Sequence, residues 1–229
     1  MTQTETTATR GTDQASERRS RWPLYGAAAG LLGYVATLVL DGRTVGADDV
    51  ALTHQLFSEL NPMVYRASMI TGYVVVALLL VFAANWRRRV EPRVPGSTAA
   101  HLVPLGLVAS AAGLAYGYGW KGSLGNYLPG GAEEGLYDDQ GLYVLYLLND
   151  FGSFIGWLGV IVAAGAVAWM GLRERTVSRW IGVISLLPVV AVVAMGSGLG
   201  VAGVPGLFAP VWLVVACLGL AFGKSTISR

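Results

Sequence analysis

Charged residues are scarce in this chain of 229 residues. Asp, Glu, Lys and Arg together make up 13% of it, whereas 54% of the residues are hydrophobic. Soluble domains carry about 25% charged residues, because their surfaces must stay hydrated. This composition excludes an ordinary soluble domain and favours a protein whose surface faces lipid.

Cysteine and histidine are also rare: the chain has one cysteine, Cys217, and two histidines, His54 and His101. One thiol forms no intrachain disulfide and supplies too few ligands for a zinc site. The two histidines lie in segments predicted on opposite sides of a membrane, which excludes a haem held between them. The sequence also has no phosphate-binding glycine loop and no Ser/His/Asp or Cys/His set, so we predict no catalytic residue, no metal site and no cofactor.

The hydrophobic residues are gathered into six long blocks. A helix of about 20 apolar residues crosses the hydrocarbon core of a bilayer, whereas a β-barrel strand alternates polar and apolar residues. The continuous blocks therefore predict an all-α polytopic membrane protein, a six-transmembrane-helix bundle. The blocks are Trp22–Leu40, Met63–Trp86, Ala99–Trp120, Leu142–Leu172, Trp180–Leu199 and Leu207–Gly223.

The blocks divide the chain into three parts. Residues 1–21 are rich in Thr, Ser, Gln and charge, so we expect a disordered cytoplasmic tail. Residues 22–223 form the predicted transmembrane domain, and residues 224–229 form a short cytoplasmic C-terminal tail.

Basic residues are distributed unevenly between the two predicted sides. One side holds thirteen of the sixteen Lys and Arg residues: four in the N-terminal tail, four after the second block, three after the fourth and two at the C-terminus. The other side holds nine of the fourteen acidic residues. Because short loops rich in Lys and Arg stay in the cytoplasm, we predict an N-in/C-in topology in the plasma membrane.

Two charged residues lie inside the apolar blocks. Arg66 precedes Arg87 by 21 residues and Asp150 precedes Arg173 by 23, which corresponds to about 31 and 34 Å of helix. The hydrocarbon core is about 30 Å thick, so both charges fall at its outer boundary. We predict a polar outer-end cluster of Arg66, Asn149 and Asp150 in which Arg66 pairs with Asp150; an interfacial position without function is the alternative.

Glycines recur four residues apart in three blocks. This spacing places small residues on one helix face, where a neighbouring helix can approach closely. We predict that they serve helix packing in a tight bundle, with homo-oligomerisation left open. The pairs are Gly26 and Gly30, Gly113 and Gly117, and Gly152 and Gly156.

A weak internal echo links two hairpins. Residues 115–119 and 194–198 both read Ala-x-Gly-x-Gly, at the same end of the third and the fifth block. A Leu-Asn pair stands before the second block, at Leu60-Asn61, and another lies in the fourth block, at Leu148-Asn149. A duplicated hairpin would explain this echo, and so would chance recurrence of small residues.

The second half of the chain carries a resemblance. It contains Leu148–Leu158 (LNDFGSFIGWL), Arg173–Gly182 (RERTVSRWIG) and Pro210–Trp212. The region from about Leu142 to Phe222 resembles small six-helix integral membrane proteins of unknown function from GC-rich Gram-positive bacteria. This resemblance implies fold and location, and it carries no catalytic residues.

Three functions fit this sequence. The first is a non-enzymatic membrane protein that acts through contacts within the bilayer, with a second copy or another membrane protein as partner and no role for nucleic acid. The second is a small transporter or channel-like unit with an outward-facing polar vestibule, which needs a water-accessible cavity. The third is a membrane enzyme acting on lipid or quinone, which needs two converging titratable groups in a lateral cleft.

Overall fold

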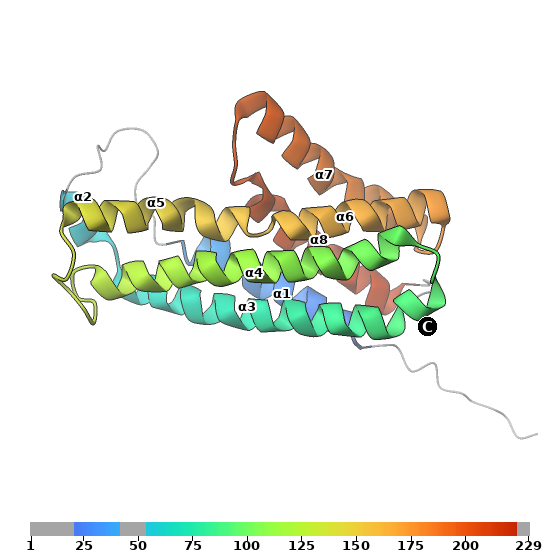
Figure 1. Cartoon of the computed structure of the whole chain (residues 1–229), viewed down its shortest axis with the longest axis horizontal. Helices are drawn as coiled ribbons and strands as arrows, with labels where there is room; N and C mark the ends of the chain where they lie inside the picture. The colour runs from blue at the N-terminus through green and yellow to red at the C-terminus, as the bar shows by residue number, and fades with distance from the viewer. Residues whose placement is uncertain (1–20, 42–53, 224–229) are drawn as a thin grey trace, which may run out of the picture.

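The computed structural model describes residues 21–41 and 54–223, and these are helical with no strand (Figure 1). The elements in chain order are α1 (Pro23–Tyr34), the π-helix η1 (Val35–Val39), α2 (His54–Glu59), α3 (Pro62–Arg89), the 3₁₀-helix η2 (Glu91–Arg93), α4 (Thr98–Tyr127), α5 (Asp139–Ile155), α6 (Leu158–Trp169), the π-helix η3 (Met170–Glu174), α7 (Arg179–Leu199) and α8 (Val204–Phe222).

Five helical segments of the described chain are long and apolar enough to cross a membrane. They are Pro62–Arg93, Thr98–Tyr127, Asp139–Glu174, Arg179–Leu199 and Val204–Phe222. The first predicted block forms a shorter apolar helix, Pro23–Val39. The prediction of an all-α chain with several helices long and apolar enough to span a membrane is therefore confirmed for the described residues.

The three longest helical segments begin at side-chain caps. Asn61, Ser97 and Asp138 each accept a hydrogen bond from a backbone N–H two or three residues further on, at 2.9–3.0 Å. Such caps satisfy N–H groups that have no partner within the helix. They fix where α3, α4 and α5 start, and so set the register of the bundle.

The end of α4 corrects the sequence analysis. The third block was predicted to end at Trp120, with Lys121 in a loop, whereas α4 continues to Tyr127. Gly122 lies inside this helix and allows close contact with α3. A Cβ at Gly122 would collide with the Met69 side chain. As a result Lys121 lies inside the bundle, with its side chain fully buried.

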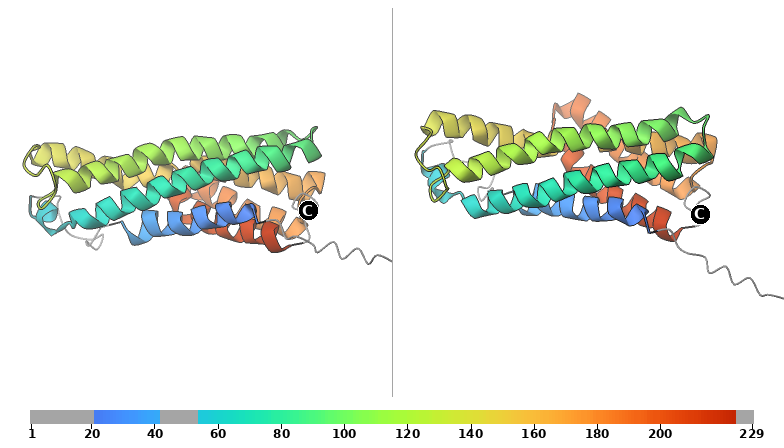
Figure 2. Two further views of the ribbon diagram at one scale, coloured as in Figure 1. Left: turned by 90° about the horizontal axis from the view of Figure 1, so that it is seen from below. Right: turned by 60° about the horizontal axis from the view of Figure 1, so that its bottom comes forward.

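The bundle is built around α4, which packs against α3 on one side and against α5 and α6 on the other. These long helices run side by side, and α1 lies between α3 and α8 (Figures 1 and 2). One end of α7 stands away from the other helices of the bundle (Figure 1).

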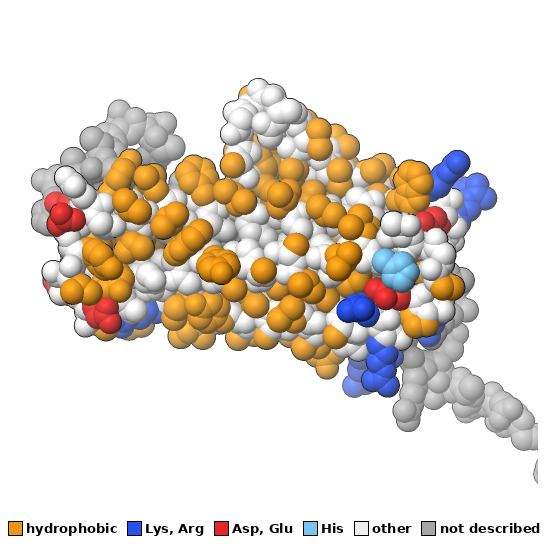
Figure 3. Space-filling view, in the orientation of Figure 1, with side chains coloured by type: hydrophobic (Ala, Val, Ile, Leu, Met, Phe, Trp, Pro, Cys, Tyr) orange, Lys and Arg blue, Asp and Glu red, His pale blue; other side chains and the backbone are white. Residues whose placement is uncertain are grey.

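Charge distinguishes the two ends of the bundle, and Figure 3 shows Lys and Arg gathered chiefly at one of them. We call the end that carries Arg87–Arg89 and Arg173 the basic end. The opposite end, which carries Glu133, Glu134 and Asp138, is called the acidic end.

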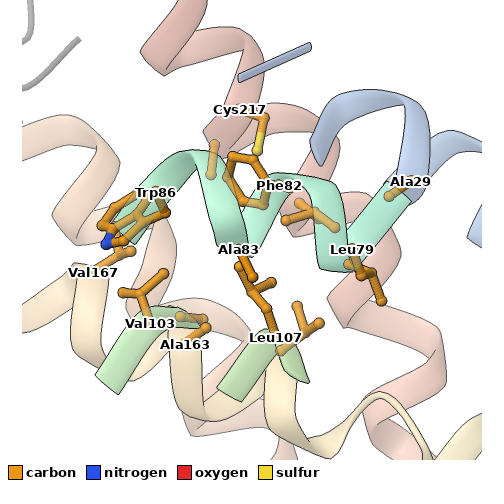
Figure 4. Close-up of a cluster of buried hydrophobic side chains, with 14 of the residues drawn as sticks. Ala29, Leu79, Phe82, Ala83, Trp86, Val103, Leu107, Ala163, Val167 and Cys217 are labelled. Atoms are coloured by element: carbon orange, nitrogen blue, oxygen red, sulfur yellow. The ribbon is translucent and has the colours of Figure 1, made fainter. Parts of the chain in front are cut away.

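The main hydrophobic core lies towards the basic end. Trp22 stacks on Phe82 with ring centroids 5.6 Å apart, and Trp86 meets both rings edge-on. The Trp86 Nε1–H donates a hydrogen bond of 2.9 Å to the Ala100 carbonyl, so its polar group is satisfied. Cys217 is buried against this cluster (Figure 4) as part of the apolar packing.

All six glycines singled out in the sequence lie at contacts between helices of the same chain. A Cβ on Gly30 would come within 2.5 Å of the Pro210 carbonyl oxygen of α8, and one on Gly117 would come within 2.5 Å of the backbone of Gly152. Gly26 faces Cys217 in the same way, and Gly113 faces Gly156. These positions bring α1 close to α8 and α4 close to α5.

Candidate functional site

Buried polar side chains from four elements gather in the half of the bundle nearer the acidic end. All six are fully buried, although their surroundings are largely apolar. We call this set the polar layer. It consists of Thr37 of η1, Ser68 of α3, Tyr118 and Lys121 of α4, and Asn149 and Ser153 of α5.

The π-helix η1 supplies a backbone acceptor to this layer. The Leu40 N–H bonds to the Val35 carbonyl at 2.8 Å, five residues back, and so bypasses the Ala36 carbonyl. That carbonyl accepts hydrogen bonds from Ser68 Oγ at 2.7 Å and from Lys121 Nζ at 3.3 Å. Short π-helical insertions often occur at functional sites, because they release backbone groups in this way.

Lys121 is the buried cation of the layer. Its Nζ lies 3.2 Å from Oδ1 of Asp41, which follows η1 and keeps 15% of its side chain exposed. An ammonium group leaves water at a cost of several kcal/mol, so it needs both a counter-charge and hydrogen bonds. The lysine therefore joins α4 to the C-terminal end of η1, where the helix dipole also favours a positive charge.

Lys121 is the residue that sequence reasoning missed. The only signal for its position was helical spacing, since Leu114, Tyr118 and Lys121 continue one buried face of α4. Treating the lysine as a loop residue hid that pattern.

A second group of hydrogen bonds links three helices through Thr37. The Trp157 Nε1–H donates to Thr37 Oγ1 at 3.1 Å, and the Tyr118 hydroxyl lies 2.9 Å from the same oxygen. One threonine thus serves polar groups from α4 and from the junction between α5 and α6, which pins η1 between them.

Asn149 and Ser153 differ from the rest of the layer. Neither the amide of Asn149 nor the hydroxyl of Ser153 has a hydrogen-bond partner in the described chain. A buried polar group without a partner costs about 1–3 kcal/mol. Asn149 and Ser153 are four residues apart on α5 and so share one face of it. Trp157 lies four residues further on, in the turn between α5 and α6, and bonds to Thr37 of η1.

The structure describes the side chains of two members of the predicted outer-end cluster of Arg66, Asn149 and Asp150, namely Arg66 and Asn149. Arg66 is half-buried beside Gly125, where a Cβ would lie 3.4 Å from its Cγ. Asn149 lies near the level of Trp120, because Gly152, one turn further on, packs against that side chain. The side chain of Asp150 lies outside the described part of the structure, so its pairing with Arg66 stays a prediction.

Apolar clusters bound the polar layer on both sides. On the acidic side lie Phe57, Leu60, Tyr65, Leu124, Leu128 and Leu142. On the basic side, the main core encloses a cavity of only about 10 Å³, at the limit for a single water molecule. The described bundle is thus closely packed at that depth.

A surface groove follows the seam between α4 and the α5–α6 pair. One hollow of about 860 Å³ is lined by Tyr116, Trp120, Phe151 and Ile155, and a second hollow of about 570 Å³ is lined by Leu102, Trp169 and Glu174. Val162 lines both, so the two hollows adjoin. Glycines line much of this seam, namely Gly113, Gly152, Gly156, Gly159, Gly96 and Gly165. Figure 3 shows hydrophobic side chains over this face of the molecule.

No family model matches this chain, and no curated protein or solved structure matches it either.

Proposed function

We propose that this protein is a six-span membrane protein with its basic end and both termini in the cytoplasm. The first span is α1 with η1, whose 12 and five residues give a rod of about 26 Å. That length is within a few ångströms of the hydrocarbon core, and a small mismatch costs little. The arginines at the basic end support the orientation, since Lys and Arg mark cytoplasmic loops. Residence in the plasma membrane and kinship with the small six-helix proteins are parts of the same proposal.

Within the membrane, the protein binds a transmembrane helix of another membrane protein along the α4/α5–α6 groove. The observation that carries this proposal is the continuity of the groove through Val162. From Thr98 at one end to Trp120 at the other, α4 advances 22 residues, or about 33 Å. A groove of that length crosses both leaflets, which suits a helix, whereas a lipid chain reaches through only one leaflet.

The lining of the groove specifies the chemistry of this partner. The half of the groove lined by Tyr116 and Trp120, towards the acidic end, is almost wholly apolar, whereas the other half is more polar and ends at Glu174. The matching helix is apolar through most of its length and carries Lys or Arg where it enters the cytoplasm, beside Glu174. Tyr and Trp suit the opposite interface, where aromatic residues are enriched.

A second copy of this chain fits the groove poorly. A two-fold symmetric dimer brings the same patch of both subunits together. Two concave seams that face each other enclose empty space, and they lose the packing that drives helix association in lipid. The geometry thus disfavours a two-fold dimer through the groove, and we propose that the convex partner is a helix of a different protein.

Photo-crosslinking in native membranes tests this proposal. A photoreactive amino acid is placed at Tyr116 in one half of the groove and at Leu102 in the other, both exposed positions that line it. We expect a protein adduct of the same mass from both positions, because one helix spans both. Adducts only with lipid, or adducts of twice the mass of this chain, would refute the proposal.

A matched pair of substitutions links the adduct to the groove. Ala109 lines the groove, whereas Ala84 is also an exposed alanine but lies on α3. We expect Ala109→Trp to fill the seam and abolish the adduct, and Ala84→Trp to leave it unchanged. Equal effects from the two variants would mean that binding occurs elsewhere.

A further inference from the structure

We propose that Asn149 and Ser153 hold internal water inside the bundle, so that the polar layer is a hydrated site. This site lies on the buried side of α5, apart from the surface groove, and the proposal is independent of what the groove binds. It rests on two fully buried polar side chains that have no hydrogen-bond partner among the described residues.

The chemistry of these two groups selects the ligand. The Asn149 amide offers two N–H donors and a carbonyl acceptor, and the Ser153 hydroxyl both donates and accepts. An ion of either sign would satisfy only the donors or only the acceptors. Water does both, carries no charge into a low-dielectric interior, and typically makes about three hydrogen bonds to otherwise unsatisfied groups when buried.

The register of the helices places this water beside the rest of the polar layer. A Cβ on Gly152 would lie 3.0 Å from the Gly117 Cα, so α5 and α4 are in close contact there. Asn149 and Ser153 flank Gly152, while Tyr118 and Lys121 follow Gly117 on α4. The four residues therefore occupy the same depth in the bundle.

One edge of the polar layer reaches the surface of the bundle at Asp41. Asp41, which pairs with the buried Lys121, keeps 15% of its side chain exposed. On the opposite side the main core closes the path with Phe82, Leu107 and their neighbours, all buried. The hydrated site thus reaches the surface only at its Asp41 edge among the described residues, and the main core closes it on the other side.

X-ray hydroxyl-radical footprinting of the purified full-length protein tests this inference, because radicals form on water and label the side chains next to it. The chain offers a matched pair of buried tryptophans. Trp157 is 0% exposed and lies four residues after Ser153, in the turn that follows α5, whereas Trp86 is 1% exposed within the main core. We expect Trp157 to be labelled several-fold faster than Trp86. Equal labelling of the two would overturn the proposal.

Two variants assign the water to the named residues. Ser153→Ala and Asn149→Leu each remove polar groups from the site, so both should lower the labelling of Trp157 and leave that of Trp86 unchanged. Unchanged labelling of Trp157 in both variants would overturn the assignment. The wild-type comparison remains decisive if Asn149→Leu fails to fold.

Thermal unfolding of Asn149→Leu is a second test, because a dry site and a hydrated site predict opposite changes in Tm. In a dry site, leucine would relieve an unsatisfied amide and raise Tm. In a hydrated site, leucine displaces bound water and strands Ser153, so we expect a lower Tm. A raised Tm would contradict the proposal.

Discussion

Lys121 Nζ and Asp41 Oδ1 lie 3.2 Å apart, although 80 positions separate the two residues in the chain. The pair is asymmetric, because the ammonium is fully buried while the carboxylate retains some exposure. The Lys121 ammonium also donates a hydrogen bond to the Ala36 carbonyl of η1. The pair therefore fixes the end of η1 against α4.

This asymmetry predicts an order of effects for the two single variants. Asp41→Asn deprives a fully buried ammonium of this carboxylate, and removing one partner of a buried pair costs about 3–5 kcal/mol. Lys121→Met leaves a carboxylate that can turn towards solvent, so its cost should be smaller. Unfolding free energies measured in detergent check the order. A larger loss in Lys121→Met would show that the lysine acts mainly through its packing.

We expect substitutions at Thr37 and at Tyr118 to differ in their cost to stability. Thr37→Val keeps the shape of the side chain but removes the oxygen that faces both Trp157 Nε1 and the Tyr118 hydroxyl. Two buried polar groups then lose this partner, and the expected cost is about 2 kcal/mol or more. Tyr118→Phe removes one group of the same set and should cost less. Equal unfolding free energies in the two variants would argue against Thr37 as the shared partner.

The hydrogen bond from Ser68 to η1 joins two elements, and a serine that bonds only within its own helix provides a control for its contribution to stability. Ser68 Oγ donates to the Ala36 carbonyl of η1, whereas the exposed Ser197 donates to Val193 within its own helix. We expect Ser68→Ala to lower the unfolding free energy by about 1 kcal/mol, the usual value of such a bond. Ser197→Ala should have little effect. Equal losses would mean that η1 does not depend on Ser68.

The apolar blocks and the caps account for what the sequence predicted well. Blocks long enough to span a membrane gave the helices, and the Asn61 and Asp138 caps begin helices close to the predicted starts. Depth along a helix also follows from residue counting, since the rise per residue is fixed. These properties are local, so one sequence reveals them.

The polar layer could not be predicted in the same way, because its contacts join segments far apart in the chain. Counting residues along the helix gave Asn149 a predicted depth, but it could not tell which neighbour Asn149 faces. Lys121 resembled an interfacial lysine, since its burial depends on Asp41 and on the π-helical register of η1. That register is set by packing against α3 and α4, and no residue pattern in Val35–Val39 marks it.

The glycine contacts yield the last prediction. Gly117→Ala places a Cβ within 2.5 Å of the Gly152 backbone, which cannot move aside as a flexible side chain would. Overpacking of this kind costs about 1–3 kcal/mol. Gly196 provides the control: it also lies within a helix, and a Cβ there meets nothing within 4 Å. Gly196→Ala should raise the unfolding free energy by about 0.5–1 kcal/mol, because alanine restricts the unfolded chain more than glycine does. If both variants shift stability in the same direction, the α4–α5 contact is looser than its geometry indicates, and the depth of the adjoining groove would have to be reconsidered.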